Sequence, residues 1–162
     1  MNGYEVFVRI IADGLLVPIV LIGAYELLFK VPKAERYEAY CRVIMAGLTA
    51  YLIASFGSVI YSSEIMRPFQ QMNTAAGALF LNNAGFPSDH TLFAAAITAA
   101  VWFETKRKFA TYLLAILTIV LAVGRVLALV HTVTDVVWGV IFALVGALWY
   151  LNVPKSKRSV SQ

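Results

Sequence analysis

The stretch FATYLLAILTIVLAVGRVLALV, Phe109 to Val130, is long and apolar enough to cross a lipid bilayer as a single helix. An α-helix rises about 1.5 Å per residue and the hydrocarbon core is about 30 Å thick, so about 20 apolar residues suffice. The rest of the chain is similar, since 60% of its 162 residues are hydrophobic and its mean hydropathy is +0.77. This apolar share exceeds that of soluble domains. The sequence therefore predicts an integral membrane protein.

Four further stretches can span a membrane in the same way. Together they predict an all-α fold, a polytopic transmembrane helical bundle of about five spans that forms a single domain over residues 1–162. Arg9 and Asp13 interrupt the first stretch, and their i, i+4 spacing lets them pair near an interface, so we expect its first turns to lie along the membrane surface. No positively charged run precedes this helix, so we expect it to be retained. The expected spans are residues 9–29, 40–61, 88–104, 109–130 and 133–151.

Lysine and arginine residues gather in the connections between these spans. With five spans, ten of the thirteen basic residues fall on one side, and the positive-inside rule assigns that side to the cytoplasm. Arg9, Arg67 and Arg125 remain for the outer side. Because the basic residues flank spans and do not form a patch interleaved with aromatic residues, we expect no nucleic-acid partner. The clustered residues are Lys30, Lys33, Arg36, Arg42, Lys106, Arg107, Lys108, Lys155, Lys157 and Arg158.

Residues 62–87, SSEIMRPFQQMNTAAGALFLNNAGFP, are too polar and too rich in glycine, asparagine and proline to span the membrane. They predict a long outer loop with an interfacial helix around Ala75 to Leu81. Loops of this length are usually functional or disordered. Arg67, in the sequence MRPF, is the first of three polar clusters expected on the outer side.

The second cluster is PSDH, at the start of the third expected span. Ser88 after Pro87 is typical of a helix N-cap, and the free amides of the first helical turn attract anions such as phosphate. Asp89 and His90 lie in that first turn, within reach of a bound anion. The alternative is that Ser88 and Asp89 only cap the helix and His90 only reaches the interface.

The third cluster is GRVLALVHTVTD, between the fourth and fifth expected spans. His131 and Asp135 are four residues apart, so on a helix they share a face, and the carboxylate can hold one imidazole nitrogen while the other acts as a nucleophile or base. Arg125 is costly in an apolar run unless it meets an anion or faces a cavity. A purely structural pairing of Arg125 with Asp135 is the alternative.

The groups expected on the outer side are those that phosphoryl transfer requires. They are two histidines, two arginines, a helix N-terminus and a carboxylate. Arginines and amides neutralise the phosphate oxygens, one histidine attacks, and the other protonates the leaving oxygen. A zinc site built from His90, His131 and an aspartate is the rival interpretation. The arginines disfavour it, because they would add positive charge around a cation.

The three clusters, in this order, resemble the signature of the phosphatidic acid phosphatase type 2 superfamily: Lys-x6-Arg-Pro, Pro-Ser-Gly-His and Ser-Arg-x5-His-x3-Asp. The resemblance covers residues 60–140 and implies an acid-phosphatase-like helical core that works without metal or cofactor. It implies that His131 is the nucleophile that forms a phosphohistidine, with Asp135 as its charge partner and His90 as the acid. Arg67, Arg125, Ser88 and the amides after it, including that of Asp89, would bind the phosphate.

The variant FPSDHT is similar to the branch of this superfamily that hydrolyses undecaprenyl diphosphate at the outer face of the bacterial cell membrane, a step of cell wall biogenesis. This resemblance implies a polyprenyl diphosphate substrate and a multi-pass protein with an extracytoplasmic site. A glycerolipid phosphate phosphatase, acting on phosphatidate or phosphatidylglycerol phosphate, and a non-catalytic lipid-phosphate binding protein are the alternatives. The sequence makes no prediction of the oligomeric state.

The chain departs from the signature in three respects. Ile60 stands where the motif lysine is expected, and Arg9 is the one unassigned basic residue that could replace it on the outer side. Gly124 stands in place of the serine before Arg125, which removes a hydrogen-bonding hydroxyl. Five spans are expected, whereas the superfamily usually has six.

Overall fold

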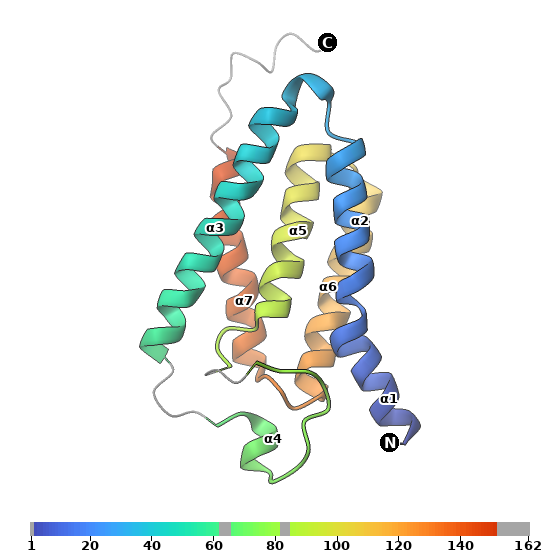
Figure 1. Ribbon diagram of the computed structural model, residues 1–162, viewed down its shortest axis with the longest axis vertical. Helices are drawn as coiled ribbons and strands as arrows, with labels where there is room; N and C mark the ends of the chain where they lie inside the picture. The colour runs from blue at the N-terminus through green and yellow to red at the C-terminus, as the bar shows by residue number, and fades with distance from the viewer. Residues whose placement is uncertain (1, 62–65, 82–84, 152–162) are drawn as a thin grey trace.

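The structure of the chain, a computed structural model, describes residues 2–61, 66–81 and 85–151. Within these ranges the secondary structure is entirely helical, and the long helices form one bundle (Figure 1). The fold class expected from the sequence is therefore confirmed. The elements are α1 (Gly3–Arg9), the π-helical turn η1 (Ile10–Gly14), α2 (Leu16–Phe29), the 3-10 turn η2 (Lys33–Glu35), α3 (Arg36–Tyr61), α4 (Pro68–Gln71), α5 (Asp89–Thr105), α6 (Lys108–Leu127), α7 (Val133–Gly146) and the 3-10 turn η3 (Ala147–Leu151).

Four helical stretches are long and apolar enough to cross a membrane, judged by length and composition. The fifth long helix, α5, has 17 residues and lies in the middle of the bundle, in contact with α2, α3, α6 and α7 (Figure 1). Because its neighbours shield it, α5 needs a less continuous apolar surface than they do. The four stretches are Gly3–Phe29, Lys33–Tyr61, Lys108–Leu127 and Val133–Leu151.

Two local expectations are wrong. Residues Ala75 to Leu81 are not helical; the short helix of the loop is α4, whose first residue is Pro68. Proline is favoured at a first helical position, because its fixed φ fits a helix and its missing N–H would have no acceptor there. Asp13 also pairs with Arg125 of α6 in place of Arg9. Residues Gly3–Phe29 continue as one helix, and the position of its first turns along the membrane surface stays a prediction.

Small and branched apolar residues pack the helices together. One buried cluster joins α2, α5 and α6 through Ile19, Val101 and Leu114, and small residues such as Ala46 bring α3 close to the end of α7. Small residues are typical of helix contacts in membranes, because they let backbones approach. Large apolar side chains face outward instead, as Phe109, at 83% exposed, does on α6.

Charged pairs lie at the end of the bundle formed by the α2–α3 and α5–α6 connections. The Arg42 guanidinium donates two hydrogen bonds of 2.7 Å to the Glu104 carboxylate, which ties α3 to α5. Arg107 lies 3.8 Å from Glu26 of α2. This is called the basic end, and it is opposite the end where α5 begins (Figure 1).

Candidate active site

The segments singled out in the sequence meet at the end of the bundle where α5 and α7 begin and α6 ends (Figure 1). This is called the site end. The loop residues 66–81 lie across it and are fixed to the α6–α7 connection by backbone hydrogen bonds. The N–H of Phe69 donates to the carbonyl of Leu129 over 3.0 Å, and the N–H of Gly77 donates to that of Ala128 over 3.0 Å. The loop therefore covers the connection that carries His131.

His131 is buried just before α7, with its two ring nitrogens in different surroundings. Nδ1 lies 2.8 Å from the carbonyl oxygen of Gly85, and 3.7 Å from Oδ2 of Asp135. A carbonyl can only accept, so Nδ1 carries the proton and Nε2 keeps its lone pair. Nε2 lies 3.4 Å from Nη2 of Arg125. The ring therefore presents a nucleophilic nitrogen next to a fixed cation.

Asp135 is near His131 and also begins α7. Its Oδ2 accepts a hydrogen bond of 2.6 Å from the Thr132 N–H, while its own N–H donates to the Thr132 hydroxyl over 3.2 Å. This reciprocal pair is a capping box. The Asp135 carbonyl also accepts from the Ser88 N–H over 3.0 Å, which joins the beginnings of α5 and α7. Asp135 thus holds the local geometry through several contacts.

Arg125 is almost fully buried in the last turn of α6. Its Nη1 donates to Oδ1 of Asp13 over 2.6 Å, and its Nη2 donates to the carbonyl of Leu79 over 2.8 Å. Its Nε has no hydrogen-bond partner within the described part of the chain. The partner of Arg125 is therefore Asp13 of η1, and the expected alternative of a pairing with Asp135 is wrong.

Arg67, just before α4, is also buried and lies in the same region. Its guanidinium donates to the carbonyls of Val130 and Leu81 over 2.7 and 2.9 Å. Burial lowers the pKa of this guanidinium below its ordinary value, while the charges of Asp135 and Asp89 act in the opposite direction. The contact with Val130 puts Arg67 next to the residue that precedes His131.

Gly85 gives Arg67 the space it occupies. Its φ of +78° favours glycine, and a Cβ at this position would lie 3.1 Å from Cζ of Arg67. Gly85 is thus a neighbour of both His131 and Arg67, and sequence reasoning missed its role. The signal was a lone glycine just before the PSDH element, which indicates a turn but not what the turn contacts.

The PSDH element begins α5, as expected. Ser88 is fully buried at the N-cap position, but its side chain makes no capping hydrogen bond; its Oγ accepts from the Thr91 hydroxyl over 3.1 Å. Asp89 is exposed, and His90 is partly buried. His90 lies in the first turn of α5 and His131 lies just before α7, so both histidines are at the site end.

Ile60, which stands in place of the motif lysine, and Arg9, its candidate replacement, are both exposed. Ile60 is 84% exposed on α3, so a side chain at this position points out of the bundle. Arg9 is exposed on α1 and makes no hydrogen bond or ion pair with the polar side chains above, among the residues that the structure describes. Nor do the described residues hold a group of three histidine, cysteine or carboxylate side chains that could bind a metal ion.

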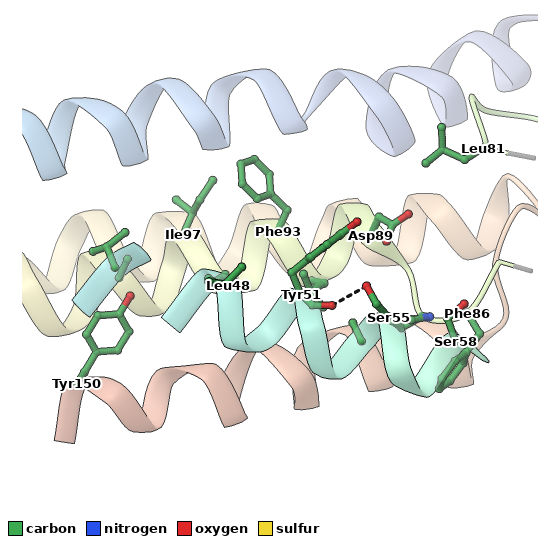
Figure 2. Close-up of a pocket in the computed structure, with 17 residues that line it drawn as sticks. Leu48, Tyr51, Ser55, Ser58, Leu81, Phe86, Asp89, Phe93, Ile97 and Tyr150 are labelled. Carbon is green, nitrogen blue, oxygen red and sulfur yellow. Dashed lines mark hydrogen bonds between the residues drawn. The ribbon is translucent and has the colours of Figure 1, made fainter. Parts of the chain in front are cut away.

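An apolar groove of about 810 Å³ runs from the site end toward the basic end between α3 and α5. Figure 2 shows Asp89, Leu81 and Phe86 at one end of it and Tyr150 at the other. Ser55 on its α3 wall donates its hydroxyl to the Tyr51 carbonyl over 2.9 Å, so that polar group is satisfied locally. The lining is largely aliphatic and aromatic, which suits a hydrocarbon chain.

One of three comparisons with known proteins gives a match. The family model of the PAP2 superfamily matches residues 39–159, which include most of α3, the helices α4 to α7 and all three motif clusters. No curated protein and no solved structure gives a match. Members of this superfamily are phosphatases that act on lipid phosphates, and the helical membrane fold and the order of the motifs fit that class. The chain therefore belongs to the PAP2 superfamily.

Proposed function

We propose that this lipid phosphatase hydrolyses undecaprenyl diphosphate to undecaprenyl phosphate through a phosphohistidine on His131. The observation that carries the proposal is the environment of this histidine: Nδ1 is held 2.8 Å from the Gly85 carbonyl, and Nε2 faces Arg125. Simple binding of an anion would not need a histidine with its lone pair turned toward the arginine.

In the proposed reaction, Nε2 of His131 attacks the terminal phosphorus. A P–N bond forms, the P–O bond of the anhydride breaks, and undecaprenyl phosphate leaves with a proton from His90. Water then attacks the phosphorus and gives a proton to His90, the P–N bond breaks, and inorganic phosphate leaves. Arg125, Arg67 and the first amides of α5, from Asp89 onward, neutralise the phosphate oxygens.

The groove supports a substrate with a single long tail. It begins beside Asp89, at the start of α5, and follows the helices in the direction in which they would cross the bilayer. A polyprenyl chain fits one groove, whereas a glycerolipid carries two acyl chains. The sequence FPSDHT adds the resemblance to the undecaprenyl diphosphate branch.

The distribution of charge supports an extracytoplasmic site. The basic end holds Arg42 and Arg107 and lies opposite the site end. If the basic end faces the cytoplasm, as the positive-inside rule requires, the site opens at the outer surface of the cell membrane.

The test is phosphate release by the purified protein in detergent with EDTA. Undecaprenyl diphosphate, phosphatidate and phosphatidylglycerol phosphate are offered in parallel to the wild type and to His131→Ala. We expect release from the polyprenyl substrate that disappears in the variant. Release from the glycerolipids alone would overturn the choice of substrate, and full activity of His131→Ala would overturn the mechanism. Wild-type binding without turnover would favour a non-catalytic binding protein.

A further inference from the structure

Asp13 closes a ring of hydrogen bonds around Arg125. Its Oδ1 accepts from Nη1 of Arg125 over 2.6 Å, and its Oδ2 accepts from the Leu79 N–H over 2.9 Å. The Leu79 carbonyl in turn accepts from Nη2 of Arg125 over 2.8 Å. The guanidinium is planar and its donors are fixed relative to one another, so two such partners set the direction of the whole group. In that direction Nη2 also lies 3.4 Å from Nε2 of His131.

The π-helical turn η1 carries Asp13. The N–H of Leu15, the residue after this turn, donates to the Ile10 carbonyl over 3.2 Å, five residues back. Such turns are rare inside α-helices and occur often at functional sites. The first helix is therefore locally widened at the turn that faces the end of α6.

Gly124 lets this turn reach Arg125. A Cβ at position 124 would lie 2.6 Å from Cγ2 of Ile11 and 2.9 Å from the backbone nitrogen of Ala12, closer than real Cβ contacts allow. The superfamily signature has a serine at this position, and that side chain would collide with η1 as it lies here. The glycine before Arg125 and the carboxylate of Asp13 are thus two parts of one contact.

We infer that Asp13 is a positioning residue for phosphate transfer, which acts by orienting Arg125. The inference rests on the proposed role of Arg125 in binding phosphate. With Nη1 and one N–H of Nη2 held by Asp13 and Leu79, the second N–H of Nη2 points to the place where the phosphoryl group meets Nε2 of His131. Preorganised donors of this kind need no rearrangement when charge develops in the transition state. Asp13 lies outside residues 39–159, which the family model matches.

The test compares Asp13→Ala, Gly124→Ser and Arg125→Lys, alone and in pairs, with Arg9→Ala as the control on the exposed side of the same helix. Two quantities are measured: kcat/KM for p-nitrophenyl phosphate, and the rise in thermal unfolding midpoint produced by inorganic phosphate. We expect Asp13→Ala to lower kcat/KM about 10- to 100-fold, which is the loss seen in metal sites when a residue that orients a metal ligand is removed. We expect Arg9→Ala to leave kcat/KM unchanged.

A residue that acts by orienting the Arg125 guanidinium should have no further effect once lysine has replaced that arginine. In the Arg125→Lys background, Asp13→Ala should therefore add less than about twofold, since residues in one network are not additive. Gly124→Ser combined with Asp13→Ala should likewise be no worse than either change alone. Full additivity in both pairs would overturn the inference and leave Asp13 a merely structural residue.

The phosphate-induced midpoint shift separates this inference from the proposed function. If the wild type hydrolyses undecaprenyl diphosphate and inorganic phosphate raises the unfolding midpoint of Asp13→Ala as much as that of the wild type, the role of Asp13 is overturned. The proposed function is then still supported. If the wild type releases no phosphate from any lipid, but its phosphate-induced midpoint shift is lost in Asp13→Ala, the role of Asp13 is supported and the proposed function is overturned. If inorganic phosphate raises the unfolding midpoint of neither protein, Arg125 does not bind phosphate, and the inference about Asp13 is overturned as well.

Discussion

The Nδ1 of His131 lies 2.8 Å from the carbonyl oxygen of Gly85, a residue 46 positions earlier in the chain. The same nitrogen lies 3.7 Å from Asp135. The proton on Nδ1 therefore has a backbone acceptor in addition to the carboxylate. A backbone carbonyl cannot be removed by a side-chain substitution, so this tautomer of His131 does not depend on Asp135 alone.

Asp135→Asn should therefore lower kcat less than a substitution that removes the only hydrogen-bond acceptor of a catalytic histidine. In serine proteases the wrong tautomer lowers kcat about 10⁴-fold, and we expect a loss well below this value here, because the Gly85 carbonyl still accepts from Nδ1. The measurement is kcat for p-nitrophenyl phosphate, with Thr132→Ala as the control that removes the hydroxyl half of the capping box. A loss as large as that of His131→Ala would show that the carboxylate is indispensable.

Gly85→Ala should lower both stability and activity. An L-residue in the left-handed region costs about 1–2 kcal/mol, and the new methyl group would press on the Arg67 guanidinium. Thermal unfolding in detergent and phosphate release are measured together. Gly3→Ala is the matched control, because a Cβ there meets nothing within 4 Å. Unchanged activity in Gly85→Ala would mean that the position of Arg67 does not matter for turnover.

His90→Ala should slow the reaction more for a substrate with a poor leaving group than for one with a good leaving group. A general acid contributes about 10²- to 10⁴-fold, and its help is needed most when the leaving oxygen is a poor leaving group. We expect a much larger loss for a phosphate ester with a poor leaving group, such as phenyl phosphate, than for p-nitrophenyl phosphate, whose leaving group departs without a proton. Equal losses for both substrates would argue that His90 binds the phosphate and does not protonate.

Filling the groove should weaken the use of long-chain substrates only. Gly47 lines the groove, and a Cβ there meets nothing within 4 Å, so Gly47→Phe would place a ring in the space. We expect kcat/KM for undecaprenyl diphosphate to fall at least about tenfold, or about 1.4 kcal/mol, with p-nitrophenyl phosphate unaffected.

The control for the groove is Ile44→Phe, at a position of the same helix that is 65% exposed and does not line the cavity. This variant adds a similar ring to the outer face of α3. If both variants reduce the use of the polyprenyl substrate equally, the tail lies somewhere other than in the groove.

The sequence predicted the long helices well, because an apolar run of about 20 residues has few other structures available in a bilayer. It also placed Arg125, His131 and Asp135 together, since short spacings on or near helices are geometric facts. It missed the pairing of Asp13 with Arg125, for which no local spacing gives a signal. It likewise missed α4, because the single proline at position 68 marks where a helix can begin but not whether it forms.

The ion pair between Asp13 and Arg125 joins residues that are 112 positions apart. During synthesis, the first helix therefore enters the membrane with a carboxylate whose partner has not yet been made. An unpaired carboxylate is costly in a bilayer, so the first helix gains part of its stability only when α6 arrives beside it. The order of assembly thus makes the N-terminal helix depend on a segment translated much later.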